Sequence, residues 1–233
     1  MTAHASPIGP GPTGPGPTAP PPAPPAVSPL RLVATLGISG ALAGLLLVSV
    51  HRVTEPVIAA HKQRVLEDAV LEVLAGPTSY RTLYLVDGAF TPDLPAGADP
   101  RTLDTVYAGL GDDGARLDGF AIPASKPGFQ DKVSLLFGWE PKDGTVRAIR
   151  VLESRETPGL GDRIEKDPAF AAGFVGRTTP LVGVKAGRGT GAPSEVDMIT
   201  GATISSRTVI DAIDTTLARL RPALDAYAAE AAR

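Results

Sequence analysis

Residues 197–206, Asp-Met-Ile-Thr-Gly-Ala-Thr-Ile-Ser-Ser, gather hydroxyl side chains directly before an apolar segment with helical spacing. The N-terminus of a helix stabilises a phosphate through its free backbone N–H groups and its positive dipole end. Thr203 is expected on or just before the first helical turn, where its hydroxyl could carry a phosphoester. The small pair Gly201 and Ala202 would let another group approach the backbone beside it.

A simpler interpretation of the same residues is helix capping. Thr, Ser and Asp are common N-cap residues, so Thr200 or Thr203 would then only satisfy backbone N–H groups. Asp197 would either present the loop or close an Asx-turn. Threonine is a weak nucleophile that needs a base and a metal at phosphorus, and no histidine lies near this stretch. A phosphoester on Thr203 would therefore be made by groups from another protein.

A second unusual stretch is residues 156–161, Glu-Thr-Pro-Gly-Leu-Gly. Two glycines and a proline in six residues favour a rigid, irregular loop that a flat ligand can approach closely. The alternative is an ordinary surface turn between a strand and a short helix near residues 167–174.

Composition excludes several function classes. The chain has 233 residues and a net charge of −3, without a basic cluster, so nucleic-acid binding is not expected. It has no cysteine, which rules out disulfides, thiolate metal sites and cysteine nucleophiles. No catalytic triad or carboxylate dyad is evident, and His51 and His61 have no partners at metal-ligand spacing. We therefore expect neither catalytic residues nor a metal site.

An uncharged apolar run over residues 32–50 is long enough for a helix to cross a bilayer. A cleaved secretory signal is the alternative, but the run is long and no clean small-x-small site follows it. The predicted organisation is a disordered Pro- and Gly-rich tail over 1–30, a transmembrane helix over 31–52, and one domain over 53–233. Positive charges follow the run more than they precede it, which by itself would place the domain in the cytoplasm.

The remaining pattern predicts an α+β domain with a mostly antiparallel sheet and flanking helices. Helices are expected over residues 55–74 and 205–220, the first ended by Gly76-Pro77. Trp139 is expected in the core. Strands are expected over residues 82–86, 105–110, 116–124, 133–140, 145–154 and 180–185, with a hairpin in which Val133, Leu135, Phe137 and Trp139 share one face.

The two loop motifs, in this order and behind one N-terminal span, resemble the FMN-binding domain family. Within it, the chain is most similar to the G subunits of Rnf electron-transport complexes, which are relatives of the C subunits of sodium-translocating NADH:quinone reductases. The resemblance covers the span and everything after it. It implies FMN as the cofactor, joined through its phosphate to Thr203 by a separate flavin transferase. One departure is the run Gly128-Phe-Gln-Asp131, where the family often has a Gly-Tyr-Gly-Gly-like run.

The resemblance also implies which residues contact the cofactor, from the matching positions of both motifs. Beyond the attachment residue Thr203, these positions are Thr200, Gly201, Ala202, Ser205, Asp197, Thr157, Pro158, Gly159, Leu160 and Gly161.

The function implied is that of a membrane-anchored flavoprotein electron carrier in an Rnf-type ion-translocating complex, working between ferredoxin and NAD. Such a chain is an electron-transfer component rather than an independent enzyme, and its partners are the other subunits of the complex. The resemblance places it in the inner membrane as a single-pass protein with the domain on the periplasmic side, against the charge pattern. Two alternatives stay open: a stand-alone flavinylated extracytoplasmic electron-transfer domain, and a flavin-free membrane-anchored scaffold in which Thr200 and Thr203 are helix caps.

Overall fold

A computed structural model describes residues 28–76, 79–100, 102–111, 114 and 116–232. The tail predicted over residues 1–30 lies almost wholly outside these ranges. The chain divides into two compact units, residues 1–56 and 57–233. The first contains most of the apolar part of helix α1 (Pro29–Val73), which is long and apolar enough to cross a membrane. The apolar run and the helix predicted over 55–74 form this one helix, with Pro56 inside it.

The second unit is built on a six-stranded antiparallel sheet with the order β2-β1-β3-β4-β5-β6. The predicted α+β class, the mostly antiparallel sheet and the hairpin are confirmed. The strands of this sheet are β1 (Ser79–Val86), β2 (Ala89–Thr91), β3 (Thr105–Leu110), β4 (Leu117–Pro127), β5 (Lys132–Glu140) and β6 (Thr145–Glu153).

A second, two-stranded sheet pairs β7 (Val182–Lys185) with β8 (Glu195–Met198) in parallel. Strand β8 was not predicted, because its four residues lie in the segment interpreted as a loop. Its side chains alternate, with Val196 and Met198 buried, and its only strand partner among the described residues is β7. A strand this short gives little periodic signal of its own.

Three helices follow the large sheet: α2 (Arg163–Lys166), α3 (Pro168–Ala172) and α4 (Thr203–Ala231). Helix α4 is longer at both ends than the predicted 205–220 and continues through Pro222. The helix continues beyond Pro222 because its apolar side is packed on the sheet both before and after this proline. Buried residues of this side include Val209, Ile213, Leu217, Leu220 and Leu224.

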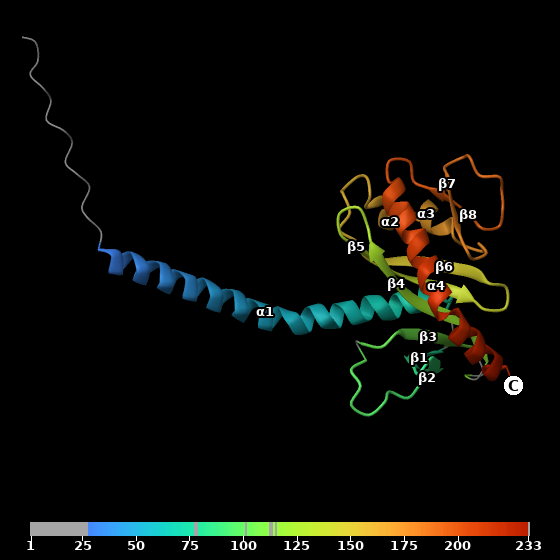
Figure 1. Cartoon of the computed structure of the whole chain (residues 1–233), viewed down its shortest axis with the longest axis horizontal. Helices are drawn as coiled ribbons and strands as arrows, with labels where there is room; N and C mark the ends of the chain where they lie inside the picture. The colour runs from blue at the N-terminus through green and yellow to red at the C-terminus, as the bar shows by residue number, and fades with distance from the viewer. Residues whose placement is uncertain (1–27, 77–78, 101, 112–113, 115, 233) are drawn as a thin grey trace, which may run out of the picture. The chain divides into compact units, whose positions relative to one another are not determined.

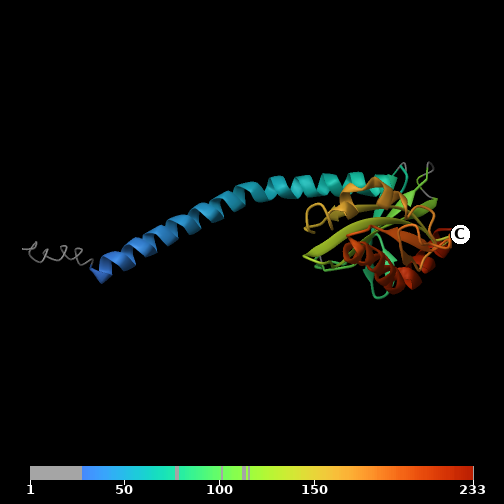
Figure 2. The ribbon, with the colours of Figure 1, turned by 90° about the horizontal axis from the view of Figure 1, so that it is seen from above.

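The sheet has a helix on each face (Figures 1 and 2). One face packs against α4 through the predicted stripe of Val133, Leu135, Phe137 and Trp139, each fully buried. The other face packs Ala121 and Leu136 against the C-terminal end of α1 and the residue that follows it, through Ala69, Val70, Val73 and Leu74. A Cβ at Gly138 would collide with the backbone oxygen of Val73, so this glycine lets the helix end lie directly on the sheet.

A partly buried arginine, Arg147, holds that helix end to the sheet. Its guanidinium donates to the backbone oxygen of Leu74 at 3.2 Å and to the Asp118 carboxylate at 2.9 Å. It also donates to Glu140 and to the backbone oxygen of Asp118. The hydrogen bond from Arg147 lowers the pKa of the Asp118 carboxyl below its ordinary value.

Replacing Arg147 by Met is expected to lower the free energy of unfolding by about 1–3 kcal/mol at pH 7, because partly buried acceptors lose their donor. A lowered pKa contributes stability above the unfolded-state value of about 3.9, and this contribution disappears as pH falls through the folded-state pKa. The loss should therefore be smaller at pH 3 than at pH 7. Urea unfolding of the full chain in detergent, followed by the fluorescence of its single tryptophan, measures this. An equal loss at both pH values would contradict the role assigned to the charge.

Candidate functional site

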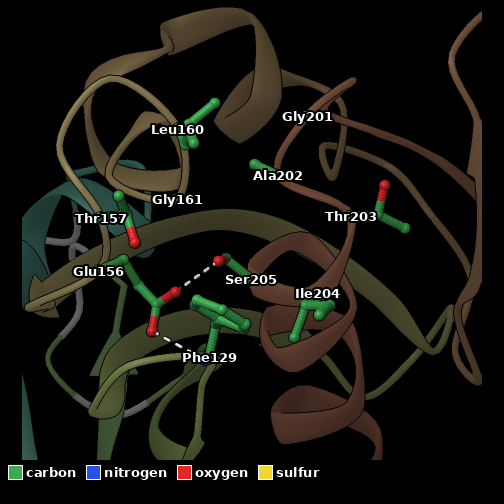
Figure 3. Close-up of a pocket in the computed structure, with 10 residues that line it drawn as sticks. All are labelled: Phe129, Glu156, Thr157, Leu160, Gly161, Gly201, Ala202, Thr203, Ile204 and Ser205. Carbon is green, nitrogen blue, oxygen red and sulfur yellow. Dashed lines mark hydrogen bonds between the residues drawn. The ribbon is translucent and has the colours of Figure 1, made fainter.

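The two sequence motifs meet around one cavity of about 330 Å³ in the second unit. Figure 3 shows loop 156–161 on one side of it, the start of α4 on another, and Phe129 below. Ten residues line this cavity: Phe129, Glu156, Thr157, Leu160, Gly161, Gly201, Ala202, Thr203, Ile204 and Ser205.

Helix α4 begins at the cavity with Thr203 as its first residue. The N-cap position is occupied by Ala202, which has no side chain able to cap, and no side-chain hydrogen bond caps this end. Gly201 has a φ of 87°, in the left-handed region that favours glycine, and turns the chain into the helix. The Thr203 side chain is exposed beside first-turn N–H groups that have no partner within the helix. The Thr203 side chain therefore does not cap the helix, which was the simpler interpretation of this residue.

Other hydroxyls of the motif have structural roles. The buried Ser206 hydroxyl accepts a hydrogen bond from the Ile199 amide at 3.1 Å and ties the preceding loop to the helix. Thr200 is exposed, and its backbone oxygen accepts from Arg163. Neither Thr200 nor Thr203 therefore caps α4 with its side chain.

Loop 156–161 leads from β6 into α2 and is closed by its own backbone. The amides of Leu160 and Asp162 both donate to the Thr157 oxygen, at 3.1 and 3.3 Å. Gly159 has a φ of 77° and makes this reversal without strain. A hydrogen bond from Lys166 at 2.7 Å lowers the pKa of Asp162 and anchors the end of the loop to α2. The loop is therefore a defined turn whose residues Thr157, Leu160 and Gly161 reach the cavity.

Glu156 connects the segments around the cavity. Its side chain is 5% exposed. One carboxylate oxygen accepts from the backbone amides of Phe129 and Gln130, at 3.0 and 3.1 Å. The other accepts from the Ser205 hydroxyl at 2.6 Å (Figure 3). Three parts of the chain, far apart in sequence, are joined by one side chain.

The structure brings most of the predicted site residues together. Seven line the cavity: Thr203, Gly201, Ala202, Ser205, Thr157, Leu160 and Gly161. Four do not: Thr200, Pro158, Gly159 and Asp197. Asp197 is exposed on β8 and lines a separate hollow with Arg177 and Glu195.

Three residues that line the cavity were not among those predicted: Phe129, Glu156 and Ile204. Phe129 lies in the run that departs from the family pattern, and Glu156 opens the second motif. Glu156 and Ile204 lie within the stretches 156–161 and 197–206, and this is the only signal that could have suggested them. Their side chains come together through contacts between distant parts of the chain, which no local pattern reports.

The cavity suits a flat aromatic group that carries a phosphate. Phe129, Leu160 and Ile204 at its edge are 66%, 52% and 57% exposed, so large apolar surfaces lie open there. A flavin ring could cover these side chains, while the first turn of α4 offers N–H groups to a phosphate. The residues present therefore fit FMN, with Thr203 at the phosphate end and the three apolar side chains at the ring.

Gly161 lies in tight contact with the centre of this site. A Cβ added there would lie 2.8 Å from Glu156 Oε2 and from Ser205 Oγ. Gly161→Ala is expected to displace both groups and to lower the free energy of unfolding by about 1–3 kcal/mol, as overpacking does. Urea unfolding of the full chain in detergent tests this. Gly111→Ala is the matched control because, among the residues that the structure describes, its added methyl group meets no atom closer than 3.5 Å. Equal effects of the two substitutions would show that Gly161 is not closely packed.

Comparison with known proteins gives agreement at the level of family and of fold. Residues 128–218 match the FMN-binding domain family. The G subunit of the ion-translocating oxidoreductase complex of Erwinia tasmaniensis is 30% identical over 188 residues, covering 78% of this chain and 85% of the relative. The protein of the same name from Methanosarcina acetivorans is 27% identical over 183 residues, covering 78% and 89%. The crystal structure of Shewanella oneidensis NqrC has the same fold, with a TM-score of 0.60 at 21% identity, covering 72% of this chain and 99% of that one.

Proposed function

This chain belongs to the FMN-binding domain family, among the G subunits of ion-translocating oxidoreductase complexes, and FMN is its cofactor. We propose that it carries FMN covalently on Thr203 and transfers electrons within an Rnf-type complex. The observation that carries the proposal is the exposed Thr203 hydroxyl at the first turn of α4, on the edge of the cavity. A phosphate diester at this position keeps one negative charge. The helix N-terminus stabilises such a charge by about 0.3–1 kcal/mol.

The residues around Thr203 divide between holding the phosphate and holding the ring. Gly201 and Ala202 leave space beside the attachment point, and Gly201 makes the turn that exposes it. Phe129, Leu160 and Ile204 would pack on the ring and keep water from part of it. FMN supplies the redox chemistry, and the chain supplies its position and electrostatic surroundings. Within the part of the chain that the structure describes, we find no triad or carboxylate dyad that would act on a small substrate.

The attachment reaction is assigned to a separate flavin transferase. Joining the Thr203 oxygen to phosphorus needs a base and a metal. The histidines of this chain are His4, His51 and His61, all far from Thr203 in sequence, and the two that the structure describes, His51 and His61, do not line the cavity. The chain is therefore proposed as the substrate of the transferase, with an exposed threonine that another active site can reach.

The apolar part of α1 is proposed to anchor the chain in the inner membrane, with residues 53–233 as the FMN-binding domain on the periplasmic side. The other subunits of the complex would be its electron-transfer partners, in a route between ferredoxin and NAD. A covalent link suits that side of the membrane because a cofactor lost there would not be replaced from the cytoplasm. Arg52, Lys62 and Arg64 follow the apolar run and would favour the opposite orientation. Protease treatment of spheroplasts and of inside-out vesicles distinguishes the two orientations: a periplasmic domain is cleaved in the spheroplasts and protected in the vesicles.

The attachment is tested on the full chain produced with a flavin transferase and purified in detergent. Its band on a denaturing gel should fluoresce under ultraviolet light, and the tryptic fragment containing Thr203 should carry the added mononucleotide. A dark band with a bare peptide mass would refute covalent attachment.

The carrier role is tested in membranes containing the whole complex. The attached FMN should become reduced when reduced ferredoxin or NADH is added, and only when the other subunits are present. Reduction in their absence would favour the stand-alone electron-transfer domain instead.

A further inference from the structure

We infer that Glu156 is the positioning residue of the FMN site: it fixes the three segments around the cavity and places one negative charge beside the flavin, which lowers the reduction potential of the flavin. This inference rests on the proposed function.

The Glu156 carboxylate joins three segments of the chain around the cavity. Glu156 Oε1 accepts from the amides of Phe129 and Gln130, which lie at the turn between β4 and β5. Oε2 accepts from Ser205 in the first turn of α4. Glu156 itself begins loop 156–161. The turn that carries Phe129, loop 156–161 and the start of α4 are therefore held in one arrangement by a single side chain.

Close packing leaves this carboxylate one position. A Cβ at Gly128 would collide with Oε1, and a Cβ at Gly161 would lie 2.8 Å from Oε2. Neither glycine has a positive φ, so space rather than backbone conformation calls for glycine at both positions. The chain encloses the carboxylate between two residues without side chains.

The charge of Glu156 is balanced by dipoles and not by a cation. All three of its described donors are neutral, and within residues 28–76, 79–100, 102–111, 114 and 116–232 no basic side chain forms an ion pair with it. The neighbouring Arg155 pairs instead with Asp131 and Glu153, at 3.7 and 3.8 Å. At 5% exposure, solvent screens the Glu156 charge weakly.

A fixed negative charge at the wall of the cavity opposes the addition of electrons to a cofactor bound there. Each electron that the flavin accepts from a partner protein without a proton adds negative charge near the carboxylate, and like charges repel more strongly in a site of low dielectric. Removing the charge while keeping the shape should therefore raise the midpoint potential.

Glu156→Gln separates charge from geometry. The amide oxygen can accept from Phe129 and Gln130, and the amide NH₂ can donate to the Ser205 hydroxyl, which then acts as acceptor. Glu156→Ala removes both the charge and the three hydrogen bonds. Glu165→Gln is the control, since Glu165 is an exposed carboxylate of α2 that does not line the cavity.

The experiment uses the full chain produced with a flavin transferase, as wild type and as the three variants. Attached FMN is measured by gel fluorescence, and the midpoint potential by dye-equilibrated titration of the flavin absorbance. We expect E156Q to keep attached FMN near the wild-type level with a more positive midpoint potential. We expect E156A to lose about tenfold or more of the attached FMN, because misplaced reacting groups slow the transfer. E165Q should match the wild type in both measurements.

The outcomes separate this inference from the proposed function. If the wild type itself carries no FMN, the proposed function fails. If the wild type is flavinylated but E156Q has an unchanged midpoint potential, the electrostatic role of Glu156 is refuted. If E156A carries as much attached FMN as the wild type, the positioning role is refuted. E156Q keeps the test decisive even when E156A does not fold.

Discussion

Replacing Thr203 by alanine is expected to remove all covalently attached FMN. On our proposal the Thr203 oxygen forms the bond to phosphorus, and alanine has no atom that can replace it. Because this hydroxyl does not cap α4, the free energy of unfolding should change by no more than about 0.5 kcal/mol. Loss of the cofactor is thereby distinguished from loss of the fold. Gel fluorescence gives the first quantity and urea unfolding of the full chain gives the second.

Two further substitutions make this prediction specific. Thr203→Ser keeps a hydroxyl in place and should keep attached FMN. Thr200→Ala removes the neighbouring hydroxyl, but the structure uses only the backbone oxygen of Thr200, so attachment should persist. A fluorescent T203A band would show that another residue carries the cofactor. A dark T200A band would mean that the attachment reaction depends on Thr200.

Replacing Trp139 by alanine should have the largest effect on stability, lowering the free energy of unfolding by about 3–5 kcal/mol. This side chain is fully buried between the sheet and α4. Its ring stacks on Phe120 with centroids 6.4 Å apart, and the Arg221 guanidinium lies 6.0 Å from the ring. Alanine would leave a cavity at the contact that holds α4 on the sheet. Since Trp139 is the only tryptophan, unfolding should be followed by circular dichroism.

A conservative replacement tests whether Trp139 acts through packing alone. Its indole N–H is buried and has no hydrogen-bond partner among the described residues. Trp139→Phe therefore loses no hydrogen bond, and we expect it to cost less than about 2 kcal/mol. Val175→Ala, at a residue 57% exposed, is the control and should change stability by about 0.5 kcal/mol or less. Equal losses for Phe and Ala would show that the indole N–H, rather than ring volume, is what the core requires.

Sequence reasoning succeeded wherever the signal was local. Alternation over Val133, Leu135, Phe137 and Trp139 predicted the hairpin and its buried face, since side chains of a strand point to opposite sides in turn. The apolar period after Ser205 predicted the helix that covers this face. The uncharged run over residues 32–50 predicted a helix able to cross a membrane. Two short motifs, each a weak signal alone, pointed to the FMN-binding family because they occur in this order behind one N-terminal span.

Only the tertiary structure decided how those motifs become a site. The sequence by itself determined the fold class, because periodicity is a property of neighbouring residues. Its two motifs also carried the resemblance that implied the family and the threonine proposed for attachment. It did not show that Glu156 joins the β4–β5 turn to α4, that Ser205 donates to a carboxylate 49 positions away, or that Asp197 faces a different hollow. These depend on hydrogen bonds and close contacts between distant segments, which form only when the whole chain packs.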